Sequence, residues 1–515
     1  MRPSSLLFLA IYFVLAAPAR LPAGEIDPRP VTFSEDVAPL VFQNCAACHR
    51  EGQIGPFALT DYASVKRRAR QIVEVTADRT MPPWHADPGV VKFSNDRSLT
   101  DEQIALIAAW AKAGMPEGDP AKTPVLPPQP DGWQLAQPDL VATMPEAFTV
   151  PAEGRDIYRK FVIPLNLDKD TWVKGVEFRP GDPKVVHHIL YYLDSTGKAR
   201  EYDARDAGPG FRGMGQSNGE FRYMGGWDVG TQPSELPHGL RYFIPKGTDL
   251  VVQIHYHPMG RETTDQSSVG FHFAEEPTAR PWSIIPVPPH FGAMQGIDIP
   301  AGAKDHEETA SFVIPTDCET FSVNAHAHYL AKRMEMTATF PDGSTRWLLK
   351  TSQWDFKWQE DYFFEKPVKL PAGTRLDVLM SYDNSEENPA NPNQPPQRVV
   401  WGPATTDEMG VITLAVMFDS PEQKEATHQA LRVFLAHQVI DRLLENDVTV
   451  FGMGRSRAGS SSQIRAQQNL DRARAPLIAL DLDKDGKLSA LERLPAVMFI
   501  LQSPYIKDLG AIGFD

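Results

Sequence analysis

The sequence predicts a multidomain protein that begins with a small all-α unit, continues with a mainly β region and ends in a helical tail. At 515 residues the chain is too long for one ordinary hydrophobic core, so several domains are expected. The spacing of apolar residues changes from helical to strand-like near residue 157 and returns to helical after residue 420. Short strand-like segments separated by Gly, Pro and Asp fill the region between, which is long enough for two tandem β-sandwiches.

The N-terminus has the pattern of an export signal. Arg2 gives a positive end, residues 6–17 are continuously apolar, and Ala17 and Ala19 offer small residues for cleavage. We therefore expect residues 1–23 to be a signal peptide and the protein to be periplasmic or extracellular. The apolar run is too short to span a bilayer comfortably, and no later segment approaches ~18 continuous apolar residues, so no membrane span is expected in the mature chain.

Charge and cysteine content narrow the class of protein further. A formal net charge of -15 argues against nucleic acids and anionic membranes as partners, because both are polyanions. Only three cysteines are present, and two of them, Cys45 and Cys48, belong to one motif. The remaining Cys318 therefore has no structural disulfide partner, and we expect it to be a small buried apolar residue.

Residues 30–118 are expected to form the small helical unit. The segment from Thr100 to Ala113 has helical spacing of its apolar side chains, with Thr100 as a candidate N-cap and two acidic residues in the first turn. Prolines then become frequent in residues 119–153, which predicts a stiff linker.

The helical unit contains the motif for covalent attachment of a c-type haem, Cys45-Ala46-Ala47-Cys48-His49. The two thiols would bind the haem vinyl groups, and His49 would be the proximal iron ligand. Met81, in the sequence Met-Pro-Pro-Trp-His, is the candidate distal ligand, and His85 is the competing one. A thiol redox pair or a zinc pair is the weaker alternative. The segment resembles class I c-type cytochromes, which implies a small cytochrome c domain.

The β region carries three histidine elements. Alternate side chains of a strand share one face, so His326 and His328 are expected to point the same way, as are Gln253, His255 and His257. Adjacent residues point to opposite faces, so His187 and His188 can bind one metal only where the backbone twists, for instance at a β-bulge. Each element alone is modest evidence for a metal site.

Taken in order with Met409, these elements resemble the copper type II, ascorbate-dependent monooxygenases, the family of dopamine β-monooxygenase and peptidylglycine α-hydroxylating monooxygenase. The flanking residues agree: Gln253-Ile254-His255-Tyr256, His326-Ala327-His328-Tyr329-Leu330-Ala331-Lys332 and Asp407-Glu408-Met409. The resemblance implies two tandem β-sandwiches, residues 154–278 and 279–420, each with one copper beside a solvent-filled cleft. It assigns the electron-transfer copper to His187, His188 and His255, and the oxygen-activating, catalytic copper to His326, His328 and Met409.

Three departures from the family separate the copper chemistry from the substrate. The chain cannot form the disulfides of the animal members, Thr413 replaces a family tyrosine, and Asn324 stands where the peptide-amidating enzyme has a carboxylate-binding arginine. A peptidyl-glycine substrate is therefore not expected, and the substrate-binding residues stay unknown. A thioether ligand stabilises Cu(I), which places dioxygen chemistry at the Met409 site.

The resulting expectation is an exported dicopper monooxygenase that inserts one oxygen atom of O2 into a C–H bond of an organic substrate. The fused haem would relay electrons from an external donor, either ascorbate or a redox protein. A copper nitrite reductase needs a type 1 copper with a Cys ligand, and Cys318 lacks the accompanying His and Met. The alternative of another class is a copper- and haem-binding redox or sensor protein without turnover.

The helical tail, residues 421–515, contains a segment, 481–492, that fits the calcium loop of an EF-hand. Gly486 allows the sharp turn, and the expected oxygen ligands are Asp481, Asp483, Asp485, Lys487 through its carbonyl, Ser489 and Glu492. A solvated acidic turn is the alternative interpretation. One complete loop is visible, so a calcium ion is expected to be structural and weakly bound.

Overall fold

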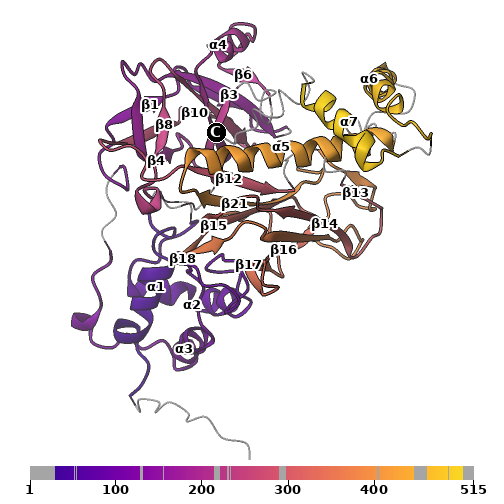
Figure 1. The fold of residues 1–515 in the computed structure, drawn as a ribbon. Helices are drawn as coiled ribbons and strands as arrows, with labels where there is room; N and C mark the ends of the chain where they lie inside the picture. Colours follow the sequence, from indigo (N-terminus) through magenta and orange to yellow (C-terminus); the bar gives the residue numbers. More distant parts are fainter. Residues whose placement is uncertain are drawn as a thin grey trace, which may run out of the picture.

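The computed structural model describes residues 29–502, except for 52, 54, 128–131, 155, 214–220, 229–230, 232, 289–296, 403–404, 446–460 and 485–486. The expected signal peptide, residues 1–23, lies outside the described residues. The described part is mainly β, with several antiparallel sheets, a helical N-terminal unit and a helical C-terminal region (Figure 1). Among the described helices, none has the length and apolar content needed to cross a bilayer.

The N-terminal unit is all-helical, as expected. Its elements are η1 (Phe33–Val37), α1 (Ala38–Asn44), α2 (Tyr62–Ala77), α3 (Asp101–Lys112) and η2 (Pro120–Lys122). Thr100 caps α3 as expected: its side chain accepts from the Gln103 amide, and the Gln103 side chain accepts from the Thr100 amide in a capping box. Phe33 and Trp110 lie at the centre of a core formed by the helices.

The first β unit consists of two principal antiparallel sheets that enclose one apolar core. The four-stranded sheet has the order β1 (Leu140–Thr143), β11 (Ser268–Ala274), β4 (Thr171–Arg179), β8 (Tyr242–Ile244). The five-stranded sheet has the order β6 (Phe211–Arg212), β3 (Ile157–Pro164), β9 (Asp249–Tyr256), β5 (Val186–Asp194), β7 (Arg222–Asp228). A strand pair, β2 (Phe148–Val150) and β10 (Thr263–Asp265), and the short helices α4 (Lys198–Asp203) and η3 (Pro237–Gly239) complete it.

The expected linker, residues 119–153, is wrong in its second half. β1 pairs with β11 and β2 pairs with β10, so residues from Leu140 onward belong to the first β unit. The prolines misled the prediction because β1 is an edge strand, where a proline nearby removes no central hydrogen bond. The pairing partners lie more than a hundred residues away, so local composition carries no signal for them.

The second β unit repeats the two-sheet arrangement around a larger core. One sheet has the order β12 (Trp282–Val287), β21 (Gly410–Met417), β15 (Cys318–Ala327), β18 (Asp361–Leu370). The other has the order β14 (His306–Val313), β19 (Arg375–Tyr382), β16 (Ala331–Thr339), β17 (Thr345–Thr351), and β13 (Asp298–Ile299) pairs with β20 (Val399–Val400). Cys318 is buried in this core, as expected, and burial raises the pKa of its thiol to about 12.

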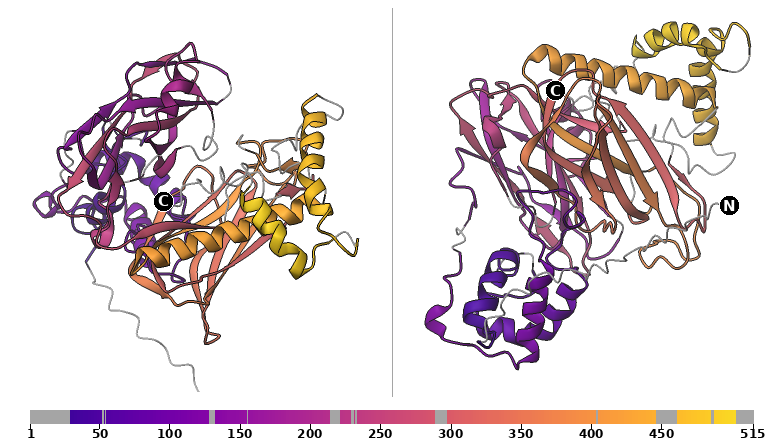
Figure 2. Two further views of the ribbon diagram at one scale, coloured as in Figure 1. Left: turned by 45° about the horizontal axis from the view of Figure 1, so that its top comes forward. Right: turned by 60° about the horizontal axis from the view of Figure 1, so that its bottom comes forward.

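The tail begins with the long helix α5 (Pro421–Leu444), which lies along the second β unit and then meets α6 (Ser461–Ile478) and α7 (Ala490–Gln502) (Figures 1 and 2). Leu431 belongs to the core of the second β unit, whereas Leu435 and the residues after it pack with α6 and α7. The helix therefore joins two hydrophobic cores.

The helical N-terminal unit docks on the second β unit, which its sequence did not reveal. Trp84 and Phe93 are buried in the core of that β unit, and Phe93 forms an isolated antiparallel bridge with Phe364 of β18. The Asn95 side chain exchanges hydrogen bonds with the backbone of β18. A segment of the helical unit that is distant in sequence from β18 therefore packs into the core of the second β unit.

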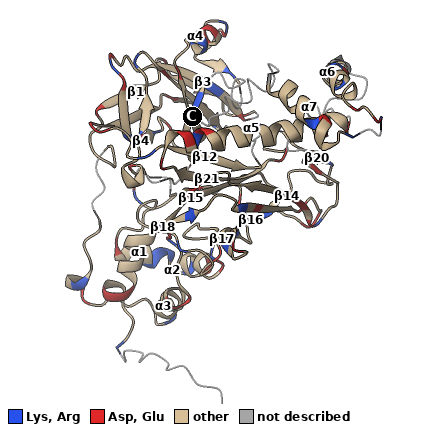
Figure 3. Ribbon diagram, viewed as in Figure 1, with Lys and Arg blue, Asp and Glu red and all other residues tan. Residues whose placement is uncertain are grey.

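Lys, Arg, Asp and Glu residues are spread over the helical unit, both β units and the tail in the view of Figure 3.

Candidate metal centres

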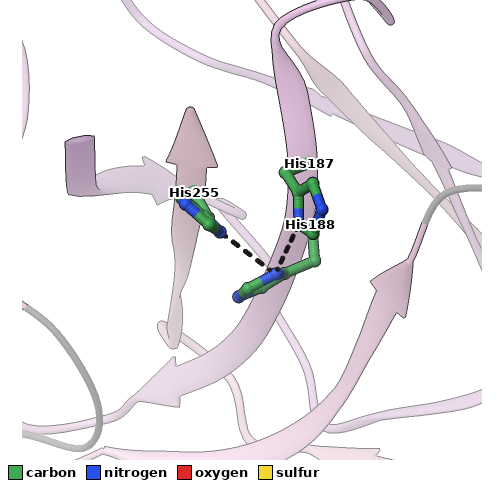
Figure 4. Close-up of side chains that lie close together, drawn as sticks. All are labelled: His187, His188 and His255. Carbon is green, nitrogen blue, oxygen red and sulfur yellow. Dashed lines mark hydrogen bonds between the residues drawn. The ribbon is translucent and has the colours of Figure 1, made fainter. Parts of the chain in front are cut away.

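Three histidines of the first β unit form a compact cluster. His187 and His188 come from β5 and His255 from the adjacent β9, and one nitrogen of each ring lies within 4.8 Å of the others (Figure 4). Nδ1 of His188 lies 3.2 Å from Nδ1 of His187 and 3.3 Å from Nδ1 of His255. A metal ion about 2.0–2.1 Å from three imidazole nitrogens in a plane holds them about 3.5 Å apart, so the cluster fits one ion.

A β-bulge brings the adjacent histidines together. In the pairing of β5 with β9, Val186 lies opposite Tyr256 and His188 opposite His255, so the register shifts across His187. The extra residue lets both side chains turn toward His255, where a regular strand would send them to opposite faces. The twist that sharing one ion requires is therefore present.

The cluster has oxygen and aromatic partners that sequence reasoning missed. The Asp156 carboxylate lies 2.9 Å from Nε2 of His255 and 2.7 Å from Nδ1 of His257. Tyr158 stacks on the His255 ring at a centroid distance of 4.3 Å. Carboxylates in this position orient a metal-binding imidazole, and an acidic residue two positions before Tyr158 gave no recognisable motif. His257 is linked to the cluster through Asp156.

Burial keeps the imidazoles of His187 and His188 neutral at neutral pH. It lowers the pKa of His187 to about 4, with the charge of His255 adding to the effect. The pKa of His188 lies well below its usual value for the same reason, and the charges of His326 and His328 also reach it. The Asp156 carboxylate is stabilised by its two histidine neighbours against burial, so its pKa falls to about 2. Neutral imidazole is the form that binds metal.

The second β unit brings His326 and His328 together at the end of β15. Their ring centroids are 5.4 Å apart. Nδ1 of His326 lies 2.7 Å from the Gln359 side-chain oxygen, and Nδ1 of His328 lies 3.1 Å from the Asp407 carbonyl oxygen. With each Nδ1 acting as a hydrogen-bond donor, Nε2 is the atom of each ring that can bind a metal. Burial lowers the pKa of His326 to about 4.

Met409 lies beside this pair because of strand pairing. It directly precedes β21, whose Gly410 pairs with Ala327, the residue between the two histidines. Met409 is buried, and its carbonyl oxygen accepts a hydrogen bond of 3.2 Å from the Tyr382 hydroxyl. A Cβ at position 410 would lie 2.2 Å from that hydroxyl, so the close approach requires glycine.

Glu408 holds the backbone that carries these candidate ligands, a role not foreseen from the sequence. Its fully buried carboxylate accepts from the Met409 amide at 2.9 Å, from the Leu330 amide at 2.9 Å and from the His328 amide. Burial raises its pKa to about 8, although these three amides oppose the shift. One side chain therefore fixes the backbone at His328 and Leu330 and, directly before the neighbouring strand β21, at Met409. The signal was its place immediately before Met409.

The haem motif forms one turn after α1. The amides of Cys48 and His49 both donate to the Cys45 carbonyl, at 3.2 and 2.9 Å, and Nδ1 of His49 lies 3.0 Å from the Phe57 carbonyl oxygen. With Nδ1 donating to this carbonyl, Nε2 is the nitrogen of His49 that could bind an iron. A Cβ at Gly55 would lie 2.8 Å from Nδ1 of His49, so this contact also depends on a glycine. Both cysteines are free thiols, and the arrangement fits a c-type haem.

The two candidate distal ligands occupy different surroundings. The Met81 amide donates to the Val75 carbonyl at 2.9 Å, and the side chain is 38% exposed on the helical unit. His85 instead lies against Trp354 of the second β unit, at a ring distance of 6.4 Å, and burial lowers its pKa. The structure therefore separates the two residues by the unit that each one contacts.

The tail contains an acidic cluster at the expected calcium loop. Carboxylate oxygens of Asp481, Asp483 and Glu492 lie within 4.8 Å of one another. The two Glu492 oxygens accept from the Leu482 amide at 2.7 Å and the Ser489 amide at 2.8 Å, which closes the loop onto the start of α7. Asp485 and Gly486 lie outside the described residues, and the Lys487 carbonyl and Ser489 stay predicted ligands.

Comparisons with known proteins add no assignment. No known family model and no curated protein matches the chain. Among solved structures, PNGF-II has a TM-score of 0.25 and 9% identity over 53% of this chain and 65% of its own. PNGase F, a glycosylasparaginase from Flavobacterium meningosepticum, has a TM-score of 0.23 and 9% identity over 53% of this chain and 97% of its own. Similarity this low carries no argument about function.

Proposed function

We propose that this protein is an exported dicopper monooxygenase of the copper type II, ascorbate-dependent kind, which inserts one oxygen atom of O2 into a C–H bond of an organic substrate. The observation that carries the proposal is the convergence of Nδ1 from His187, His188 and His255, together with a second histidine pair beside Met409. The two pairs of facing sheets support two tandem β-sandwiches, with one ligand set on each.

The two proposed ligand sets differ in chemical type, as expected if one copper transfers electrons and the other activates dioxygen. Copper bound at both would supply one-electron transfer at the all-imidazole set and dioxygen activation at the set with a thioether, which favours Cu(I). The chain's own residues orient the ligands: Asp156 holds His255, Gln359 holds His326, and the Asp407 carbonyl holds His328.

The helical unit is proposed to be a cytochrome c domain that relays electrons from an external donor, either ascorbate or a redox protein. Cys45 and Cys48 would bind the haem covalently and His49 would be the proximal ligand, with its Nδ1 held by Phe57. Met81 is the favoured distal ligand, because His85 is packed against the second β unit.

The tail is proposed to bind one calcium ion as a structural element. Its ligands would be the carboxylates of Asp481, Asp483, Asp485 and Glu492, the Lys487 carbonyl and Ser489. Hard oxygen ligands of this number suit calcium, and the three described carboxylates already lie close together.

Metal analysis followed by oxygen consumption tests the proposal. The purified protein should contain two coppers and one haem per chain, and an organic substrate should be hydroxylated with matching O2 uptake. His326→Ala should lose one copper and all turnover. His306, which pairs with Glu308, belongs to neither set, so His306→Ala should keep both coppers and its turnover. Two coppers with no oxygen use under any substrate would instead support a redox or sensor protein without turnover. No copper binding at all would refute the proposal.

A further inference from the structure

One short segment touches the helical unit and both histidine sets. This bridging segment, residues Trp354–Glu360, lies in the loop that joins β17 to β18. One side of it contacts the helical unit, and the other side contacts the two histidine sets.

The first side of the bridging segment contacts the helical unit. Glu360 forms an ion pair with Arg97, whose guanidinium also lies 5.1 Å from the Trp358 ring centroid. Nε of Arg97 donates a hydrogen bond to the Pro83 carbonyl at 3.0 Å. With this bond Arg97 also contacts the loop that follows Met81. The loop that carries the candidate distal ligand Met81 is therefore tied to this end of the bridging segment through Arg97.

The second side holds His326. The Gln359 side-chain oxygen accepts from Nδ1 of His326 at 2.7 Å, and its amide nitrogen donates to the Phe356 carbonyl at 3.0 Å. Gln359 directly precedes Glu360, so the residue that holds His326 is adjacent to the residue that pairs with Arg97. A displacement of Glu360, where the segment meets the helical unit, can therefore move Gln359 and with it the His326 imidazole.

Phe356 connects the two histidine sets. Its buried ring stacks on His187 at a centroid distance of 5.7 Å and an angle of 19°, and meets His328 edge-on at 5.4 Å. Tyr329 packs on it at 4.6 Å. The separation of the His187 and His328 rings therefore cannot exceed the sum of the two Phe356 distances. An aromatic ring occupies space where the family resemblance implies solvent.

We propose that the bridging segment is the route by which the helical unit exchanges electrons with the two histidine sets, entering at the His326 set and continuing to the His187 set through Phe356. This inference rests on the proposed function. Each electron that follows the route leaves one ferrous haem ferric and converts one cupric ion to cuprous. An external one-electron donor restores the haem. Phe356 and Gln359 act as positioning residues, because they contact ligands rather than the metals.

Rapid mixing tests the route without any substrate. The oxidised, metal-loaded protein is mixed anaerobically with one reducing equivalent per chain, and haem absorbance is followed while freeze-quenched samples report the two Cu(II) signals by EPR. The wild-type haem should be reoxidised at a rate independent of protein concentration. Phe356→Leu should slow reduction of the His187-set copper, because it removes the aromatic ring that contacts His187, and leave reduction of the His326-set copper unaffected.

Matched variants separate the possible outcomes. Phe312→Leu makes the same change at a buried position in the core of the second β unit and should behave as wild type, and Phe356→Tyr should restore the rate. If Phe356→Leu and Phe312→Leu give equal rates while wild-type transfer is intact, the inference is overturned and the proposed function stands. A wild-type protein without concentration-independent transfer would remove the haem relay itself.

The entry point has its own test. His187→Ala removes the first set, yet the haem should still be reoxidised, because electrons enter at the His326 set. Loss of haem reoxidation in His187→Ala would show that electrons enter at the first set and would overturn the inference. Copper content and haem spectra of each variant report whether the remaining sites are intact.

Discussion

The Asp156 carboxylate lies 2.9 Å from Nε2 of His255, while Nδ1 of the same ring faces His188 at 3.3 Å. The His255 imidazole therefore contacts a carboxylate through one nitrogen and the histidine cluster through the other. A carboxylate in this position would orient the ring and make the opposite nitrogen a stronger metal ligand.

Asp156→Asn should lower the copper affinity of the first set by about 10- to 100-fold, because the neutral amide orients His255 less strongly. Competition with a chelator of known affinity measures this, with the second set as an internal reference. Asp168→Asn alters an exposed carboxylate of the same β unit and should leave both affinities unchanged. Equal affinities in the two variants would contradict a role for Asp156.

The metal-free protein should lose stability as the pH falls from about 6.5 toward 4. His187 has a folded pKa of about 4, so between these values the unfolded chain binds more protons than the folded one, and unfolding becomes more favourable as the pH drops. Denaturant unfolding at several pH values measures the slope. The slope reports how many more protons the unfolded chain binds than the folded one. In His187→Gln this number near pH 5 should be smaller by about one. An unchanged slope would show that His187 is not buried in its neutral form.

Glu408→Ala should destabilise the protein on the order of 3–5 kcal/mol, because it leaves the buried amides of His328, Leu330 and Met409 without their acceptor. The second set should lose copper in the same variant, since these amides place its ligands. Chemical denaturation and metal analysis report the two effects. Glu365→Ala, at an exposed position of β18, is the control and should change neither.

Calcium should raise the melting temperature of the intact protein, because an ion bound only by the folded state stabilises it. The double variant Asp481→Asn, Glu492→Gln should abolish this shift and leave the melting temperature without calcium nearly unchanged. Asp471→Asn on α6 removes an exposed carboxylate outside the loop and should retain the calcium effect. A calcium-dependent shift that survives in the double variant would exclude the loop as the site.

Replacing the two candidate haem ligands in turn identifies the distal one. Met81→Ala should change the haem absorption spectrum and lower the reduction potential, because a thioether axial ligand raises it. His85→Ala should leave both nearly unchanged and affect the contact with Trp354 instead. The reverse pattern would assign His85 to the iron.

Much of the local structure follows from short patterns. Thr100 and Gln103 cap α3 because their side chains satisfy amides three residues away, and alternation of apolar residues placed His255 and His326 on strands. The bulge at His187 was stated as a condition for sharing one ion and is present. The expected linker failed because β1 and β2 are defined by partners far along the chain.

The sequence by itself therefore determined the type of each element and the chemical character of the candidate ligands: imidazoles on strands, a thioether after an acidic pair, thiols on one turn. Only the tertiary structure decided which side chains support them. Asp156, Gln359 and Phe356 belong to no motif, and they reach His255, His326 and His187 through space. The physical reason is that periodicity reports which face of an element is apolar, whereas a contact between two elements depends on pairing and packing that no local pattern encodes.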